Sequence, residues 1–184
     1  MGWNDVTNKN NSNSERPPYA KLTEGNTIIR VLDEEPYSFW QHWINKARTS
    51  AICGEPDCPI CEIIKNAKKE GIPSEYQNSR RHAMRIWNYT TNRMEILIQG
   101  RSFMNDLYVL HKEVGDIREY DIKVVRKGLD KSTTYSLLPM AVSKFEHEDE
   151  IEDIDLPEIF KPTKREVTLK LMVGIPKEEA YSEE

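Results

Sequence analysis

All three cysteines of this 184-residue chain lie at positions 53, 58 and 61, and this clustering constrains the fold more than any other feature. Cys58 and Cys61 have the spacing of a zinc knuckle, and Cys53 supplies a third sulfur just upstream. Three cysteines cannot all pair, and a reducing cytosol would not keep a disulfide. The surrounding "GEPDCP" is a turn sequence, where buried core positions are not expected. A redox dithiol is the other alternative, but no βαβ pattern precedes the pair. The cluster therefore predicts one structural zinc ion.

A closed zinc site needs a fourth ligand, and spacing alone leaves two histidines open. His42 is the nearest one upstream, and His82 lies beyond the cluster at the mouth of a predicted strand. A catalytic zinc is not expected, because the His-x-Glu element of nucleic-acid deaminases is missing. Four protein ligands would also leave no position for water. We therefore predict that the chain is not an enzyme.

Short β-branched and aromatic runs outnumber helical patterns and indicate a mainly β fold. Strands are expected at 26–33, 81–90, 92–100, 120–128 and 133–139. Helices are expected at 59–71, between a Pro and a Gly, and at 101–115, where Phe103, Leu107 and Leu110 have helical spacing. The string fits a five-stranded OB-type barrel with an inserted zinc module at about 42–71 and a few short helices. An α+β sheet of another topology would give much the same string.

The charge is unevenly distributed along the chain. The net charge is −5, yet residues 141–184 hold thirteen acidic against six basic residues, which leaves a mildly basic body. We expect a disordered N-terminal arm (1–20), a binding domain (21–140) and an acidic C-terminal tail (141–184), which should be solvated over residues 144–160. Residues 163–174 fit a terminal helix or, through alternating apolar residues, a strand; the capping-box spacing of Thr163 and Glu166 favours the helix.

Two further absences in the sequence bear on location. No run approaches the length of a membrane span, so no membrane partner is expected. The N-terminus lacks an apolar signal region, which favours a cytoplasmic protein.

Basic and aromatic residues alternate across the predicted hairpin at 81–100 and around the last turn. Proteins that bind single strands combine a basic track for phosphates with flat rings on which bases stack. In a strand, Arg85, Trp87 and Tyr89 share one face, which we predict to be the binding side. The alternative is that Trp87 and Tyr89 are core residues. The candidates for base stacking or phosphate contact are Tyr37, Trp40, Trp43, Arg80, Arg81, Arg85, Trp87, Tyr89, Arg93, Arg126, Lys127 and Tyr135.

The order of these features resembles the phage single-stranded-DNA-binding proteins of the T-even type, over about residues 20–140. The resemblance rests on "IIRVLDEEPYSFWQHWI", on the ligand order His, Cys, Cys-x-x-Cys, and on "YDIKVVRKGLDKSTTYSLLP". It implies a zinc-containing OB fold with an acidic C-terminal tail. It also implies His42, Cys53, Cys58 and Cys61 as the zinc ligands.

The resemblance further implies a non-enzymatic role in the host cytoplasm, coating single-stranded DNA in phage replication, recombination and repair. Replication or recombination proteins are expected partners of the tail, and the protein is expected to be monomeric off DNA. The chain departs from the family in two respects. The N-terminal arm has no basic motif for cooperative assembly, and the first two cysteines are closer together.

A function from another class also fits the sequence. The chain would then be a zinc-stabilised protein adaptor of replication or transcription, with the acidic tail as its working part. The adaptor hypothesis predicts little affinity for oligonucleotides and no loss of binding on Trp87→Ala.

Overall fold

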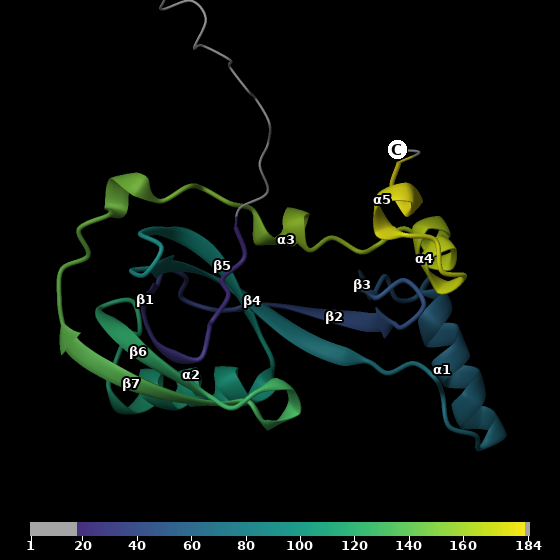
Figure 1. Ribbon diagram of the computed structural model, residues 1–184, viewed down its shortest axis with the longest axis horizontal. Coiled ribbons are helices and arrows are strands. Elements are labelled where there is room, and N and C mark those ends of the chain that lie inside the picture. Colours follow the sequence, from purple (N-terminus) through teal and green to yellow (C-terminus); the bar gives the residue numbers. More distant parts are fainter. Residues whose placement is uncertain (1–17, 183–184) are drawn as a thin grey trace, which may run out of the picture.

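Seven antiparallel strands form one sheet in the computed structural model, which describes residues 18–182 (Figure 1). The strands are β1 (Gly25–Val31), β2 (Tyr37–Ile44), β3 (Thr49–Ile52), β4 (Ser79–Asn88), β5 (Arg93–Gln99), β6 (Tyr120–Lys127) and β7 (Thr134–Val142). Their order in the sheet is β3-β2-β4-β1-β6-β7, and β5 pairs with β4. The mainly β class is confirmed, and a strand lies at each expected position.

The sheet does not close into the expected five-stranded barrel. In the part of the chain that the structure describes, β7 pairs only with β6. The outer edge of β5 is taken instead by the segment that precedes β1. Ile96 accepts a hydrogen bond from the Ala20 amide at 2.9 Å and donates one to the Pro18 carbonyl at 2.9 Å. These bonds satisfy the backbone groups through which β7 would have closed the barrel, so the prediction of closure was wrong.

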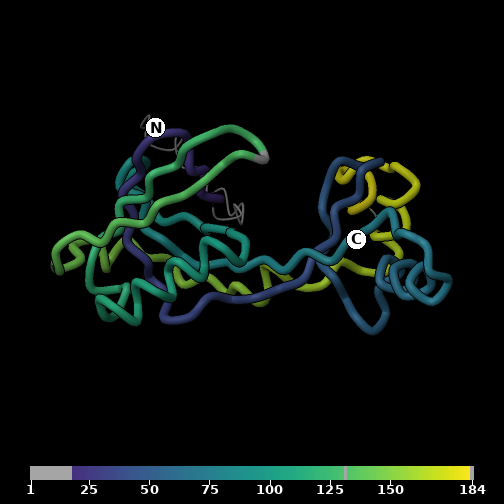
Figure 2. The backbone as a smooth tube through the Cα atoms, turned by 90° about the horizontal axis from the view of Figure 1, so that it is seen from below, coloured from purple at the N-terminus to yellow at the C-terminus, as the bar shows by residue number. Residues whose placement is uncertain are grey.

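Two of the strands, β2 and β3, were not expected. β1 and β2 pair one after the other with β4, at residues 86–88 and 79–83 respectively. β2 and β4 then extend away from the rest of the sheet, so the molecule has two lobes (Figure 2). We call β1, β5, β6, β7, α2 (Arg101–Glu113) and the adjoining half of β4 the large lobe. The small lobe consists of β3, the end of β2, α1 (Pro59–Glu70), α4 (Arg165–Met172) and α5 (Lys177–Ala180).

The helices follow local sequence signals. α1 begins with Pro59 at its first position and ends at Gly71, whose φ of 70° is the left-handed value that glycine adopts most readily. α4 lies where a helix was favoured over a strand, and Gly174 follows it with a φ of 97°. The single-turn helix α3 (Leu156–Ile159) is capped by Asp155, and short 3₁₀ turns lie at Asp130–Ser132 and Glu148–Glu150. None of the described helices is both long and apolar enough to cross a membrane.

Three clusters of buried side chains hold the fold together. α2 packs Phe103 and Leu107 against the inner face of the large lobe, where Ile29, Ile86 and Ile122 are buried. A second core joins α1, α4 and the end of β2 in the small lobe. The third core lies on the outer face of β2, β4 and β5, where the C-terminal segment covers Phe39, Ala83 and Ile96.

The expectation that residues 144–160 are solvated is wrong for apolar side chains among them. Leu156 and Phe160 are no more than 7% exposed, and Val167 and Leu171, in the part expected to form a helix, are buried as well. The acidic composition concealed the apolar residues interspersed among the carboxylates, which bury themselves while the acids face solvent. The expected N-terminal arm lies largely outside the described residues, except for Pro18–Ala20, which run along β5.

Candidate metal centre and nucleic-acid interface

The four predicted metal ligands come from the β2–β3 hairpin and the start of α1. His42 pairs with Ala51 across the hairpin, and Cys53 lies two residues further on. Because side chains alternate along a strand, Cys53 and His42 point to the same face. Cys58 is the N-cap of α1, and Cys61 lies in its first turn. Hairpin and helix therefore each contribute two ligands.

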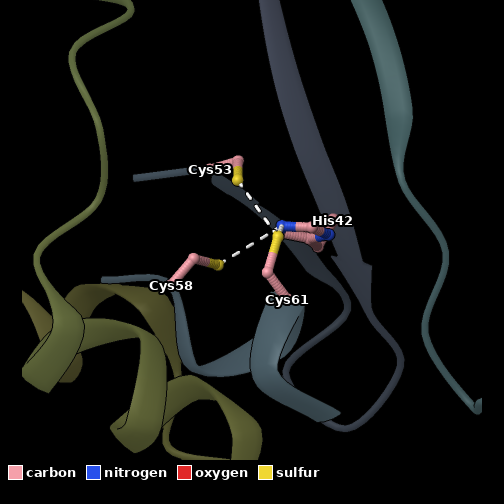
Figure 3. A group of neighbouring side chains, drawn as sticks. All are labelled: His42, Cys53, Cys58 and Cys61. Atoms are coloured by element: carbon pink, nitrogen blue, oxygen red, sulfur yellow. Dashed lines mark hydrogen bonds between the residues drawn. The ribbon is translucent and has the colours of Figure 1, made fainter. Parts of the chain in front are cut away.

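The ligand atoms converge on one point, as Figure 3 shows, and all lie within 4.8 Å of one another. Cys53 Sγ and Cys61 Sγ are 3.4 Å apart, and His42 Nε2 lies 3.4 Å from Cys58 Sγ and 3.6 Å from Cys61 Sγ. A tetrahedral zinc ion with ordinary bond lengths would place two sulfurs about 3.8 Å apart, and a sulfur and a nitrogen about 3.6 Å apart. The cluster is therefore compatible with a structural metal site.

His42 is held ready to act as a ligand. Its side chain is fully buried, and its Nδ1 lies 3.3 Å from the Gln77 carbonyl. If Nδ1–H donates to that carbonyl, the lone pair of Nε2 is left facing the sulfurs. Burial lowers the pKa of His42, which favours the neutral imidazole that metals bind.

The structure also distinguishes between the two histidines that were candidates for the fourth ligand. His82 lies in β4, where its Nδ1 is 2.8 Å from the Ser38 hydroxyl, and it is not part of the ligand group. Only His42 can complete the set with the three cysteines.

The three cysteines are free thiols, and their environment disfavours isolated thiolates. The 3.4 Å between Cys53 Sγ and Cys61 Sγ is far longer than a disulfide bond of about 2.05 Å. Burial raises the pKa of both Cys53 and Cys61, and the neighbouring cysteines add to the shift for Cys61. Converging thiolates repel one another unless a cation binds between them, which is the charge that a divalent metal supplies.

The face predicted to bind nucleic acid is covered by the C-terminal segment. Trp87 is 1% exposed, and its ring stacks on that of His147 at 4.3 Å between centroids. Phe145 meets the same indole edge-on at 6.0 Å. The Tyr89 hydroxyl donates to Asp121 at 3.0 Å. With this segment in place, the Trp87 ring is closed to a base and Tyr89 is only partly exposed.

The other basic residues on or near the covered face have local partners. Arg85 is paired with Asp33 at 2.7 Å, and Arg93 with Glu95 at 3.1 Å. Arg81 and Tyr37 are partly buried, and the Tyr37 ring lies 6.3 Å from that of Phe160. The charges of Arg85 and Arg93 and the ring of Tyr37 therefore make contacts within the protein.

The opposite face of β2 and β4 carries an open groove. Trp40 is 48% exposed there, and the Arg80 guanidinium lies 5.9 Å from its ring centroid. The groove has a volume of about 740 Å³ and runs between these strands and α2. It is lined by Pro36, Ser38, Trp40, Asn78, Ser79, Arg80, His82, Arg101, Met104, Asn105 and Tyr108.

Several groove residues were missed by the sequence predictions. Arg101 and Tyr108 project from α2, and Lys112 lies over the Tyr108 ring at 5.5 Å from its centroid. Tyr108 is 61% exposed and stands outside the apolar spacing of Phe103 and Leu107, which could have marked it as a surface aromatic.

The remaining candidates lie on the two lobes at either side. Trp43 is 53% exposed on the β2–β3 hairpin of the small lobe, and its Nε1 donates to Asn45 at 2.9 Å. Lys127 is exposed at the end of β6, and Arg126 beside it contacts Thr133 at 3.4 Å. Tyr135 packs edge-on against Phe103 at 5.3 Å, which makes it largely a core residue.

Comparison of the chain with known protein families, curated proteins and solved structures found no match. The function proposed below therefore rests on the residues and geometry of the chain itself.

Proposed function

We propose that this protein binds single-stranded DNA without base specificity, and that the open groove on β2, β4 and α2 is the binding surface. The observation that carries this proposal is the pairing of exposed rings with cations. Trp40 lies beside Arg80, and Tyr108 lies beside Lys112. A stacked base is worth about 1–3 kcal/mol, and every base has a π face, so such sites tolerate any sequence.

Cations lie in the groove and on the large lobe beside it. Arg126 and Lys127 stand at the end of β6, whereas Trp43, three residues after Trp40 in β2, points to the opposite face of that strand. Arg101, at the start of α2, adds a further cation to the groove wall. The binding surface proposed here keeps Trp40, Arg80, Arg126 and Lys127 from the sequence prediction, leaves out Trp43, and treats the covered residues as structural.

We assign the metal centre to one structural zinc ion. One imidazole and three thiolates are the donor set that zinc prefers, and tetrahedral geometry suits the observed spacing. His42, Cys53, Cys58 and Cys61 would hold the ion, and four protein ligands leave no coordination position for a water. Its contribution is to fold the small lobe, for which such sites supply about 10 kcal/mol or more.

The strand order supports a relation to OB folds. Along β5-β4-β1-β6-β7, the pairing follows the neighbour order of that barrel without its closing ladder. OB folds are partly open and bind oligonucleotides on the face of their second and third strands and the adjoining loops. β4 and β5 would be those strands, and the small lobe would be an elaborated loop before β4. The C-terminal segment covers the outer face of β4 and β5, so the groove proposed here lies on the other face and includes no residue of β5.

We propose, from the sequence resemblance, that the protein acts in phage DNA replication, recombination and repair in the host cytoplasm. It would be a monomer when DNA is absent. The acidic residues between 146 and 158 are all exposed and could recruit replication or recombination proteins. The same exposure is the observation that favours the adaptor as a second candidate.

Fluorescence titration of the metal-loaded protein with an oligo-dT strand tests the proposal. We expect tryptophan quenching that salt reverses, and we expect Trp40→Ala to weaken binding by about 1–3 kcal/mol. Trp87→Phe is the matched control, because this ring is buried and should not affect affinity. A flat titration of the wild-type protein would rule out single-strand binding and favour the adaptor.

A further inference from the structure

The segment from Ile151 to Met172, here called the strap, is attached to both lobes. On the outer face of the sheet, Phe160 stacks on Phe39 of β2 with 4.5 Å between ring centroids and 14° between ring planes. Phe160 is 4% exposed, and Leu156 is buried in the same cluster against Ala83 and Ile96. This part of the strap is therefore fixed to the strands that also form the groove floor.

The next residues of the strap are bonded to the metal-ligand loops. The Thr163 amide donates to the Ile52 carbonyl at 3.0 Å, and the Ile52 amide donates to Thr163 Oγ1 at 2.9 Å. Ile52 directly precedes the ligand Cys53. Arg165 forms a two-pronged bond to Glu62 at 2.8 and 3.0 Å and also reaches Asp57 at 3.2 Å, on either side of Cys58 and Cys61.

The helix at the end of the strap completes the small-lobe core. Val167 and Leu171 of α4 are buried together with Ile44, Ile60 and the cysteines. In Figure 2, the strap runs beside β2 and β4 from one lobe to the other. A two-stranded ribbon by itself twists readily and is marginally stable, so a third, buried connection restricts the angle between the lobes.

The position of Trp40 depends on the same contact. Phe39 and Trp40 are adjacent in β2, so their side chains point to opposite faces of the strand. Phe39 is held by Phe160 on one face, and Trp40 stands in the groove on the other. A shift of β2 away from the strap would move the Trp40 ring.

We propose that the strap sets the position of the small lobe relative to the groove floor, with Phe160 as the positioning residue for Trp40. The part that concerns DNA rests on the proposed function, whereas the part that concerns the lobes does not. An acidic tail that competed with DNA for a basic surface would have the opposite effect on binding. Loosening the strap should weaken single-strand binding, whereas displacing a competitor would strengthen it.

Point substitutions in the full chain test this, because truncation would remove core residues of both lobes. Phe160→Leu keeps an apolar side chain but removes the ring stack. Thr163→Val keeps the shape of the side chain but removes the hydroxyl that accepts from the Ile52 amide and lies 3.5 Å from the Tyr181 hydroxyl. Spin labels attached through unnatural residues at Lys69 in α1 and Val109 in α2 report the distance between the lobes and spare the cysteines. Both positions are exposed on helices. Oligo-dT affinity and zinc content are measured on the same samples.

We expect each variant to retain zinc, to broaden the distance distribution between the labels, and to bind oligo-dT several-fold more weakly. Leu169→Ala, at an exposed position on the strap helix, should leave the zinc content, the distance distribution and the oligo-dT affinity unchanged. An unchanged distribution in both folded variants would overturn the proposal, and so would tighter DNA binding. If the wild-type protein fails to bind DNA, the proposed function fails, and the distance measurement still decides whether the strap positions the lobes.

Discussion

Arg30 is an arginine buried near the end of β1 at 1% exposure, and its charge must be compensated there. Its Nε donates to Asp121 Oδ1 at 2.7 Å, and its Nη atoms donate to the Arg118 carbonyl at 3.0 Å and to Ser143 Oγ at 2.7 Å. Tyr89 donates to the same Asp121 oxygen. This network joins β1, β6 and the start of the C-terminal segment.

Replacing Arg30 with Met should be strongly destabilising. The substitution leaves the Asp121 carboxylate without its cation, and breaking a buried ion pair in this way costs about 3–5 kcal/mol. Urea unfolding followed by circular dichroism measures the change. Arg118→Met is the matched control, because its pair with Asp116 lies at the surface, and it should cost much less. Similar losses in the two variants would contradict the role assigned to Arg30.

Tyr89 makes the stability of the protein sensitive to alkaline pH. Burial and then the hydrogen bond to Asp121 raise its pKa from the usual 10.0 to about 12. Between these values the unfolded chain releases the phenol proton while the folded chain retains it, so the contribution falls as pH rises and is intact below pH 10. Tyr89→Phe should lower the free energy of unfolding at neutral pH by about 1 kcal/mol. Between pH 10 and 12, the variant should lose less of its remaining stability than the wild-type protein does. Unfolding curves at several pH values test this, and parallel losses in both proteins would contradict it.

At the scale of elements, the small lobe is built around its ligands. The hairpin places His42 and Cys53 on one face, and the start of α1 brings Cys58 and Cys61 to them. Its buried residues form a small cluster in which two cysteines are themselves members. A cluster of this size has little apolar surface, so we expect the lobe to depend on a bound metal ion for its fold.

Cys61→Ser should therefore abolish stoichiometric metal binding and unfold the small lobe. Cobalt(II) titration is the measurement, since a tetrahedral thiolate site gives intense visible and near-ultraviolet absorption that the variant should lack. Lys69→Ala, on the exposed side of α1, should bind one cobalt per chain like the wild-type protein. Normal cobalt absorption in Cys61→Ser would show that the four residues are not a single site.

For the whole molecule, the two faces of β2 and β4 carry different charge. The C-terminal segment lies on the outer face with its carboxylates exposed, whereas the groove on the opposite face presents Arg80 and Arg101. Under the proposed function, this separation of charge would let a chain of net charge −5 attract a polyanion to the groove.

The salt dependence of binding should locate the phosphate contacts. Each phosphate neutralised on a single strand contributes about −0.7 to the slope of log affinity against log salt. Arg80→Gln and Lys127→Gln should each reduce that slope by about 0.7. Arg85→Gln should leave it unchanged, because Arg85 is already paired with Asp33. Oligo-dT titrations at four salt concentrations measure this, and a reduced slope for Arg85→Gln alone would place the strand on the other face.

The features that depend on neighbours along the chain could be predicted from the sequence alone. The cysteine spacing located the ligand cluster, Pro59 and Gly71 bounded α1, and β-branched runs marked the strands of the large lobe. β2 was missed because its aromatic residues could equally have belonged to a surface loop or a core.

The tertiary structure alone decided which histidine completes the metal site and which aromatic residues are exposed. His42 and His82 are both near the cysteines in sequence, and only the hairpin register brings one of them to the sulfurs. Trp87 and Trp40 both lie in short runs with other aromatic residues, yet one is covered by the C-terminal segment and the other faces a groove. That segment is acidic in composition, and its burial depends on an apolar sheet face formed by residues far earlier in the chain. Local patterns do not contain such long-range contacts. The acidic composition therefore predicted a tail, whereas the folded chain packs this segment against the sheet as the strap.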